Sequence, residues 1–169
     1  HAIITNVEAV HLETMGSLEN IARAKCEVLD FIKQGSFALI HGDNDLLLQT
    51  AAAYSSRLFT FGYRENSDIQ ILSVENDGTG ILVSLRVFAV KETFFLPLPV
   101  DQLASNLAAA VGMALLMGVS LQNIKTALSQ FTPGDKRMNR IPLKEGGVVI
   151  DDTYNANPLS MAAALDACH

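Results

Sequence analysis

The apolar residues in the first third of the chain change between short continuous runs and helical spacing, and this pattern predicts a β-α-β-α-β order. Ser17 can cap the first helix and Gly35 can end it. Strands that are joined through helices form parallel sheets with right-handed crossovers. Buried strands are expected at residues 2–7, 37–40 and 58–61, and helices at residues 18–33 and 46–54.

The hydrophobic period changes in the middle of the chain, where apolar and polar residues alternate over residues 69–74, 80–88 and 91–98. This alternation predicts three antiparallel strands. Apolar helices are expected at residues 103–117 and 121–130, the second of them capped by Ser120. The predicted fold class is therefore α/β, with a mostly parallel sheet, crossover helices and an appended antiparallel meander.

The last part of the chain begins with a break in the pattern at residues 132–138, which predicts an interdomain linker. A strand at 140–143, a glycine turn, a buried strand at 148–151 and a helix start follow. Two strands and one helix cannot bury their apolar faces alone. We therefore expect a domain boundary after residue 133, with 134–169 forming the first unit of a second, Rossmann-like domain. We also expect the chain to be truncated at both ends.

Composition narrows the possible functions. Hydrophobic residues make up 49% of the 169 residues and charged residues 18%, which indicates a globular protein. The net charge of −6 argues against nucleic-acid binding, which depends on lysine and arginine. Cys26 and Cys168 lie far apart and form no zinc or disulfide pattern. They are expected to be two buried thiols in a reducing cytoplasm. No apolar stretch is long enough to span a membrane.

Two polar positions near the first predicted strand are candidates for chemistry. His11 follows this strand by a few residues, so the imidazole is expected at the carboxyl edge of the sheet, where it can bind a divalent metal or a phosphate. The alternative is a loop histidine bonded to the backbone. Lys25 lies between Ala24 and Cys26 in a predicted helix. It is either paired or modified near the buried side, or a surface lysine with a packed stem.

Further candidates lie at later boundaries. The carboxamide of Asn106, near a helix start, suits the edge of an adenine or a buried structural hydrogen bond. Arg137 in the linker either binds phosphate or is solvated. Asp152 follows the strand at 148–151 and either faces a ligand or caps the turn. Tyr154, Asn155 and Asn157 follow it in an amide-rich segment before Pro158. Ligands bind at the carboxyl ends of strands in open α/β sheets.

Two of these segments resemble the Mur ligases. The run I-T-N-x-x-x-x-H-L-E-x-x-G-S-L-x-x-I-A-x-A-K-x-E, at residues 4–27, resembles the segment that follows the nucleotide-binding strand of that family. Residues 151–158 resemble the D-D-S-Y-N-A-N-P motif of one branch. The helix of Asn106 resembles a family helix, although Val100-Asp101-Gln102 replaces its usual Gly-x-His-Asn. The H-L-E and G-S variants look most like the enzymes that add D-alanyl-D-alanine.

The resemblance implies a set of residue roles. The matching histidine, His11, would coordinate Mg²⁺, and a carbamylated Lys25 would help to hold the metal. Asn106 would contact the adenine of ATP, Arg137 would reach ATP, and Asp152 would contact the ribose. The residues that would line the substrate cleft are Tyr154, Asn155 and Asn157. Residues 1–133 would be the C-terminal part of a central ATP-binding domain, and residues 134–169 the hinge and the start of the C-terminal domain.

The resemblance also implies an activity. A cytoplasmic ligase, monomeric when full length, would use ATP and Mg²⁺ to join D-alanyl-D-alanine to UDP-N-acetylmuramoyl-tripeptide through an acyl phosphate, in peptidoglycan synthesis and hence in cell shape and division. No Gly-x-x-x-x-Gly-Lys-[Ser/Thr] loop occurs in the chain, so the chain alone is expected to bind nucleotide weakly and not to catalyse. The alternatives are a sister Mur ligase, a folylpolyglutamate synthase, or a non-catalytic α/β nucleotide-binding module.

Overall fold

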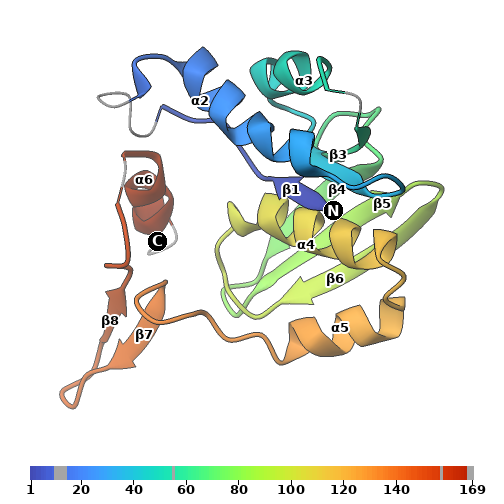
Figure 1. Ribbon diagram of the computed structural model, residues 1–169. Helices are drawn as coiled ribbons and strands as arrows, with labels where there is room; N and C mark the ends of the chain where they lie inside the picture. The colour runs from blue at the N-terminus through green and yellow to red at the C-terminus, as the bar shows by residue number, and fades with distance from the viewer. Residues whose placement is uncertain (10–14, 55, 157, 167–169) are drawn as a thin grey trace.

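The computed structural model describes residues 1–9, 15–54, 56–156 and 158–166. Figure 1 shows one large sheet with helices on both faces, followed by a separate hairpin and a last helix. In spatial order the strands of the sheet are β1 (Ala2–Ile4), β2 (Phe37–His41), β3 (Arg57–Gly62), β4 (Ile69–Asn76), β5 (Ile81–Val87) and β6 (Val90–Leu96). Strands β1 to β4 pair in parallel, and β4 to β6 pair antiparallel. The predicted sheet with an appended meander is therefore confirmed.

The helices divide between the two faces of the sheet (Figure 1). On one face lie α2 (Leu18–Cys26) and α3 (Asp45–Ala51), and on the other lie α4 (Leu103–Leu116) and α5 (Leu121–Ser129). Because successive side chains of a strand point to opposite faces, Ala38 and Ile40 of β2 belong to the core under α2 and α3, whereas Leu39 belongs to the core under α4. None of the described helices is long and apolar enough to cross a membrane.

The helix predicted at residues 18–33 is shorter than expected. Ser17 caps it as predicted, accepting a hydrogen bond from the backbone N–H of Asn20 at 3.2 Å. The α-helix ends at Cys26, however, and residues Glu27–Phe31 form the 3₁₀ helix η1. Val28 and Phe31 are exposed, so burial does little to hold these residues, which have modest helix propensity, in an α-helical turn. The first strand is also shorter than predicted, since β1 ends at Ile4.

The last segment forms the predicted hairpin and helix, with β7 (Asn139–Pro142), β8 (Val148–Asp151) and α6 (Pro158–Asp166). The prediction that residues 148–151 form a buried strand is wrong for this chain, because Val148 is 47% exposed and Val149 is 45% exposed. Strand β8 pairs with β7 in a sheet of two strands, and such a sheet cannot bury both of its faces. The proposed domain division after residue 133 stays a prediction.

The carboxyl ends of the parallel strands are joined by side-chain hydrogen bonds. Asn44 caps α3 by accepting a bond from the N–H of Leu47 at 2.9 Å. The side-chain amide of the same residue donates to Asn6 Oδ1 at 3.1 Å and to the carbonyl of Val7 at 2.9 Å. The segment that follows β1 is thereby held beside the end of β2, and the polar residues of both segments face the same edge of the sheet.

Candidate functional site

A cleft of about 510 Å³ lies between the sheet and the C-terminal segment. Its walls are the carboxyl edge of β1 and β2, the start of α4, the linker, and one side of α6. The residues that line it are Thr5, Asn6, Glu8, His41, Leu98, Val100, Gln102, Leu103, Ser105, Asn106, Phe131, Pro133, Gly134, Arg137, Met138, Asp152, Ser160, Ala163 and Ala164. A larger cavity of about 680 Å³ lies between α2, η1 and α3, and none of the predicted site residues that the structure describes lines it.

The cleft brings together three of the predicted site residues, Asn106, Arg137 and Asp152, which lie on α4, in the linker and after β8. The side chain of Asn106 is exposed, and no hydrogen bond to another described residue occupies its carboxamide. Asp152 is half-buried and accepts a hydrogen bond from the backbone N–H of Met138 at 3.1 Å. The guanidinium of Arg137 lies over the ring of Tyr154, with Cζ 4.0 Å from the ring centroid. An amide, a cation and a carboxylate therefore share one cavity.

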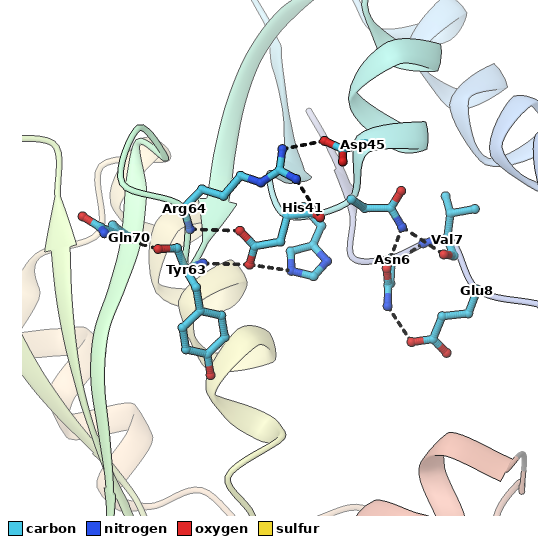
Figure 2. A network of polar contacts seen from close by, with 10 residues as sticks. Asn6, Val7, Glu8, His41, Asp45, Tyr63, Arg64 and Gln70 are labelled. Atoms are coloured by element: carbon cyan, nitrogen blue, oxygen red, sulfur yellow. Dashed lines mark hydrogen bonds and ion pairs between the residues drawn. The ribbon is translucent and has the colours of Figure 1, made fainter.

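His41 is a cleft residue that the sequence analysis did not select. It ends β2 (Figure 2), and its ring stacks on Phe61 with centroids 5.0 Å apart. Its Nε2 lies 3.5 Å from Asp43 Oδ2, which favours the tautomer with the proton on Nε2. Its Nδ1 is buried and has no hydrogen-bond partner in the described part of the chain. His41 could have been selected from the sequence by its place at the end of an apolar strand, which is the feature that pointed to Asp152.

The pKa of His41 is lower than its ordinary value because burial penalises the imidazolium. The carboxylates of Asp43 and Glu8 oppose this effect, and the guanidinium of Arg64 adds to it. The ring is therefore neutral at pH 7. Glu8 is itself held at the cleft, where its Oε1 accepts a hydrogen bond from the side-chain amide of Asn6 at 2.5 Å.

Asp43 positions this histidine because its carboxylate is fixed by the backbone. It accepts hydrogen bonds from the N–H groups of Tyr63 at 2.7 Å and Arg64 at 2.9 Å (Figure 2). This approach requires glycine at position 62, where φ is +148° and an added Cβ would lie 2.5 Å from Asp43 Oδ2. Arg64 closes the network through an ion pair with Asp45 at 2.6 Å.

Comparison with known proteins identifies the family. Residues 1–114 match the family described as "Mur ligase middle domain". The chain belongs to the Mur ligase family. It is 30% identical over 164 residues to the UDP-N-acetylmuramoyl-tripeptide–D-alanyl-D-alanine ligase of Bacillus subtilis, covering 97% of this chain and 35% of that protein. It is 28% identical over 169 residues to the UDP-N-acetylmuramate–L-alanine ligase of Streptomyces avermitilis, covering 98% of this chain and 36% of that protein.

The structural comparison agrees with the family assignment. The crystal structure of MurF from Acinetobacter baumannii superposes with a TM-score of 0.86 and 30% identity, over 99% of this chain and 37% of that one. This chain therefore spans about a third of the length of the Mur ligases that it matches. The α/β architecture described above is the Mur ligase fold.

Of the two residues predicted from the Mur ligase resemblance to bind metal, the structure describes one. His11 lies outside the described residues. Lys25 is exposed on α2, and its Nζ donates a hydrogen bond of 2.8 Å to the carbonyl of Asn6, just beyond the end of β1. Its amine therefore reaches the sheet edge that borders the cleft. Among the residues that the structure describes, no group of three or more His, Cys, Asp or Glu side chains is placed to hold a metal.

Two of the residues predicted to line the substrate cleft, Tyr154 and Asn155, do not line the cavity. Tyr154 is 64% exposed and its ring contacts Arg137, while the side chain of Asn155 is exposed and accepts a bond from the N–H of Ala156 at 2.9 Å. Neither residue lines the cleft described above. Asn157 lies outside the described residues.

Replacing Gly62 by alanine is expected to lower the free energy of unfolding by about 1–3 kcal/mol, because residue 62 has a φ that L residues rarely adopt and the methyl group would collide with the Asp43 carboxylate. Urea denaturation of the chain measures the loss. Gly134→Ala is the matched control, since a Cβ there would meet its nearest neighbour at 3.9 Å. Equal midpoints for the two variants would contradict the account of Asp43.

The depressed pKa of His41 predicts a dependence of stability on pH. Below about pH 6.5 the imidazole of the unfolded chain binds a proton that the folded chain does not yet bind, so the free energy of unfolding falls as the pH falls. Urea denaturation between pH 7.5 and 5.0 should show a steeper decline for the native chain than for His41→Asn. Identical slopes would show that His41 does not titrate in this way.

Proposed function

We propose that this chain is the nucleotide-facing part of an ATP-dependent ligase that joins D-alanyl-D-alanine to UDP-N-acetylmuramoyl-tripeptide. The observation that carries the proposal is the cleft in which Asn106, Arg137 and Asp152 come together from three separate segments. Their groups match the three parts of ATP. The exposed carboxamide of Asn106 suits the donor–acceptor edge of adenine, Asp152 can accept from a ribose hydroxyl, and Arg137 suits the phosphates.

Magnesium is the second cofactor in this proposal. His11 and a carbamylated Lys25 would hold it, with the position of the Lys25 amine beside the end of β1 as the structural support. The oxygen groups at this edge, the carboxylate of Glu8 and the carbonyl of Asn6, are of the kind that Mg²⁺ prefers. When bound, the metal would neutralise charge on the transferring phosphoryl group.

The proposed reaction has two steps. A carboxylate is a poor electrophile, so ATP first phosphorylates the terminal carboxylate of the tripeptide, giving an acyl phosphate and ADP. The amine of the dipeptide then attacks the acyl carbon, and phosphate leaves as the amide forms. Stabilisation of charge on the migrating group should dominate catalysis, and in this chain Arg137 is the cation of the cleft that can supply it.

The positions of the residues proposed to bind ATP suggest how nucleotide binding and domain movement are coupled. Asn106 belongs to the lobe that contains the large sheet, whereas Arg137 lies in the linker and Asp152 follows β8. A ligand that contacts all three residues is stabilised only when the two parts approach each other. We therefore propose that ATP closes the lobes, in a cytoplasmic enzyme that is monomeric when full length.

A second candidate function is addition of L-alanine to UDP-N-acetylmuramate. The similarity to an L-alanine ligase, 28% identity over 98% of the chain, supports it. The H-L-E and G-S residues within 4–27 favour the dipeptide-adding enzyme. Assays of the full-length enzyme with D-alanyl-D-alanine, L-alanine, D-glutamate and diaminopimelate should show activity with the dipeptide and UDP-N-acetylmuramoyl-tripeptide. Activity with L-alanine and UDP-N-acetylmuramate instead would reject the first candidate.

Arg137→Ala in the full-length ligase is expected to raise the KM for ATP by about tenfold or more, because a charge-assisted hydrogen bond to phosphate is lost. Steady-state kinetics with varied Mg-ATP measure the change. Arg140→Ala removes an exposed arginine of β7 and is the control. If Arg137→Ala leaves both KM and kcat unchanged, the arginine has no part in the mechanism.

A further inference from the structure

The environment of Arg137 is unusual for a cation in an exposed linker. Its guanidinium lies over one aromatic ring, with Cζ 4.0 Å from the centroid of Tyr154, and it forms no ion pair with any residue in the described part of the chain. A cation over a ring is attracted by the π-face and needs no hydrogen bond for this contact, so the N–H donors of the guanidinium remain available. Since Arg137 also lines the cleft, these donors are available to a ligand there.

The backbone on both sides of Arg137 adopts a conformation that must be held by other contacts. Lys136 has φ of +59° and Met138 has φ of +53°, and neither residue is glycine. Left-handed conformations of such residues cost free energy and persist where neighbouring contacts enforce them. Here the segment after β8 supplies both contacts. The N–H of Tyr154 donates to the carbonyl of Lys136 at 3.1 Å, and Asp152 Oδ1 accepts from the N–H of Met138 at 3.1 Å.

These contacts join residues 136–138 to residues 152–154. Two backbone-directed hydrogen bonds set the path of the linker, and the ring of Tyr154 then restrains the side chain of Arg137, which lies between Lys136 and Met138. The ring is 64% exposed and does not line the cleft. Burial of the ring therefore does not account for its position, whereas the contact with Arg137 does.

We propose that Tyr154 is a positioning residue for ATP, because its ring holds the Arg137 guanidinium at the cleft, where the N–H donors can bind the phosphates. This inference rests on the proposed role of Arg137 as an ATP contact. It assigns Tyr154 to the nucleotide rather than to the peptide substrate. Loss of the ring should therefore weaken the binding of ATP and leave the affinity for the other substrates unchanged.

The kinetic test compares Tyr154→Leu with Tyr154→Phe in the full-length ligase. Removal of the ring should raise the KM for ATP about two- to fivefold, the range for an exposed cation–π contact, whereas phenylalanine keeps the ring and should keep the low KM. The KM for tripeptide and dipeptide should not change. Tyr63→Leu is the matched control, since it removes another exposed tyrosine, over whose ring no cation of the described residues lies.

A double-mutant cycle separates this inference from the proposed function. If Tyr154 acts through Arg137, Tyr154→Leu should have no further effect on the KM for ATP in an Arg137→Ala background. An effect of equal size in both backgrounds would overturn the inference while leaving the role of Arg137 intact. A raised KM for the dipeptide or tripeptide would also overturn it. If Arg137→Ala itself does not change the KM for ATP, the proposed role of Arg137 fails first.

The stack can also be tested without nucleotide. The chain contains no tryptophan, so Tyr154→Trp introduces a single tryptophan, which can be excited selectively and whose indole should lie under Arg137. Adding Arg137→Ala to this variant should shift the emission of the indole, and adding Arg140→Ala should not. Emission that is unaffected by the loss of Arg137 would show that the stack does not form in solution.

Discussion

The parallel alignment of β1, β2 and β3 is the constraint on which the rest of the structure depends. Because these strands run in the same direction, their carboxyl ends meet at one edge of the sheet, and every segment that leaves a strand begins there. Asn6, Glu8 and His41 reach the cleft for this reason. The alignment is stabilised by burial of β2 on both faces, since Leu39 packs in one core and Ala38 and Ile40 in the other.

Polar contacts then refine this edge. The amide of Asn44 bridges the ends of β1 and β2, and the carboxylate of Asp43 bridges the end of β2 and the loop after β3. Each bridge satisfies backbone groups that regular strand pairing leaves free at the end of a sheet. The neutral His41 is the exception, because its Nδ1 has no partner among the residues that the structure describes, and an unsatisfied buried polar atom carries a free-energy cost.

The second wall of the cleft has a different physical basis. The hairpin of β7 and β8 buries little apolar surface, and the hydrogen bonds between residues 136–138 and 152–154 join two parts of this C-terminal segment to each other. The segment is attached to the sheet through the linker and through the residues that line the cleft. Such an attachment is weak compared with a packed core, and it suits a part that moves relative to the sheet. The groups proposed to bind nucleotide are therefore divided between a rigid lobe and one that is held by few interactions.

The sequence by itself determined the order of helices and strands, the antiparallel meander and the cap at Ser17, because these depend on local hydrophobic period and on hydrogen bonds between near neighbours. It also identified the segments that form the cleft, since polar residues after apolar strands mark the carboxyl edge of a sheet. Only the tertiary structure decided that Asn106, Arg137 and Asp152 share a cavity, that His41 joins them, and that Tyr154 lies on Arg137. These are contacts between residues distant in sequence or between side chains whose direction the local pattern leaves open. The exposure of β8 was decided in the same way, because burial of a strand depends on which other elements pack against it.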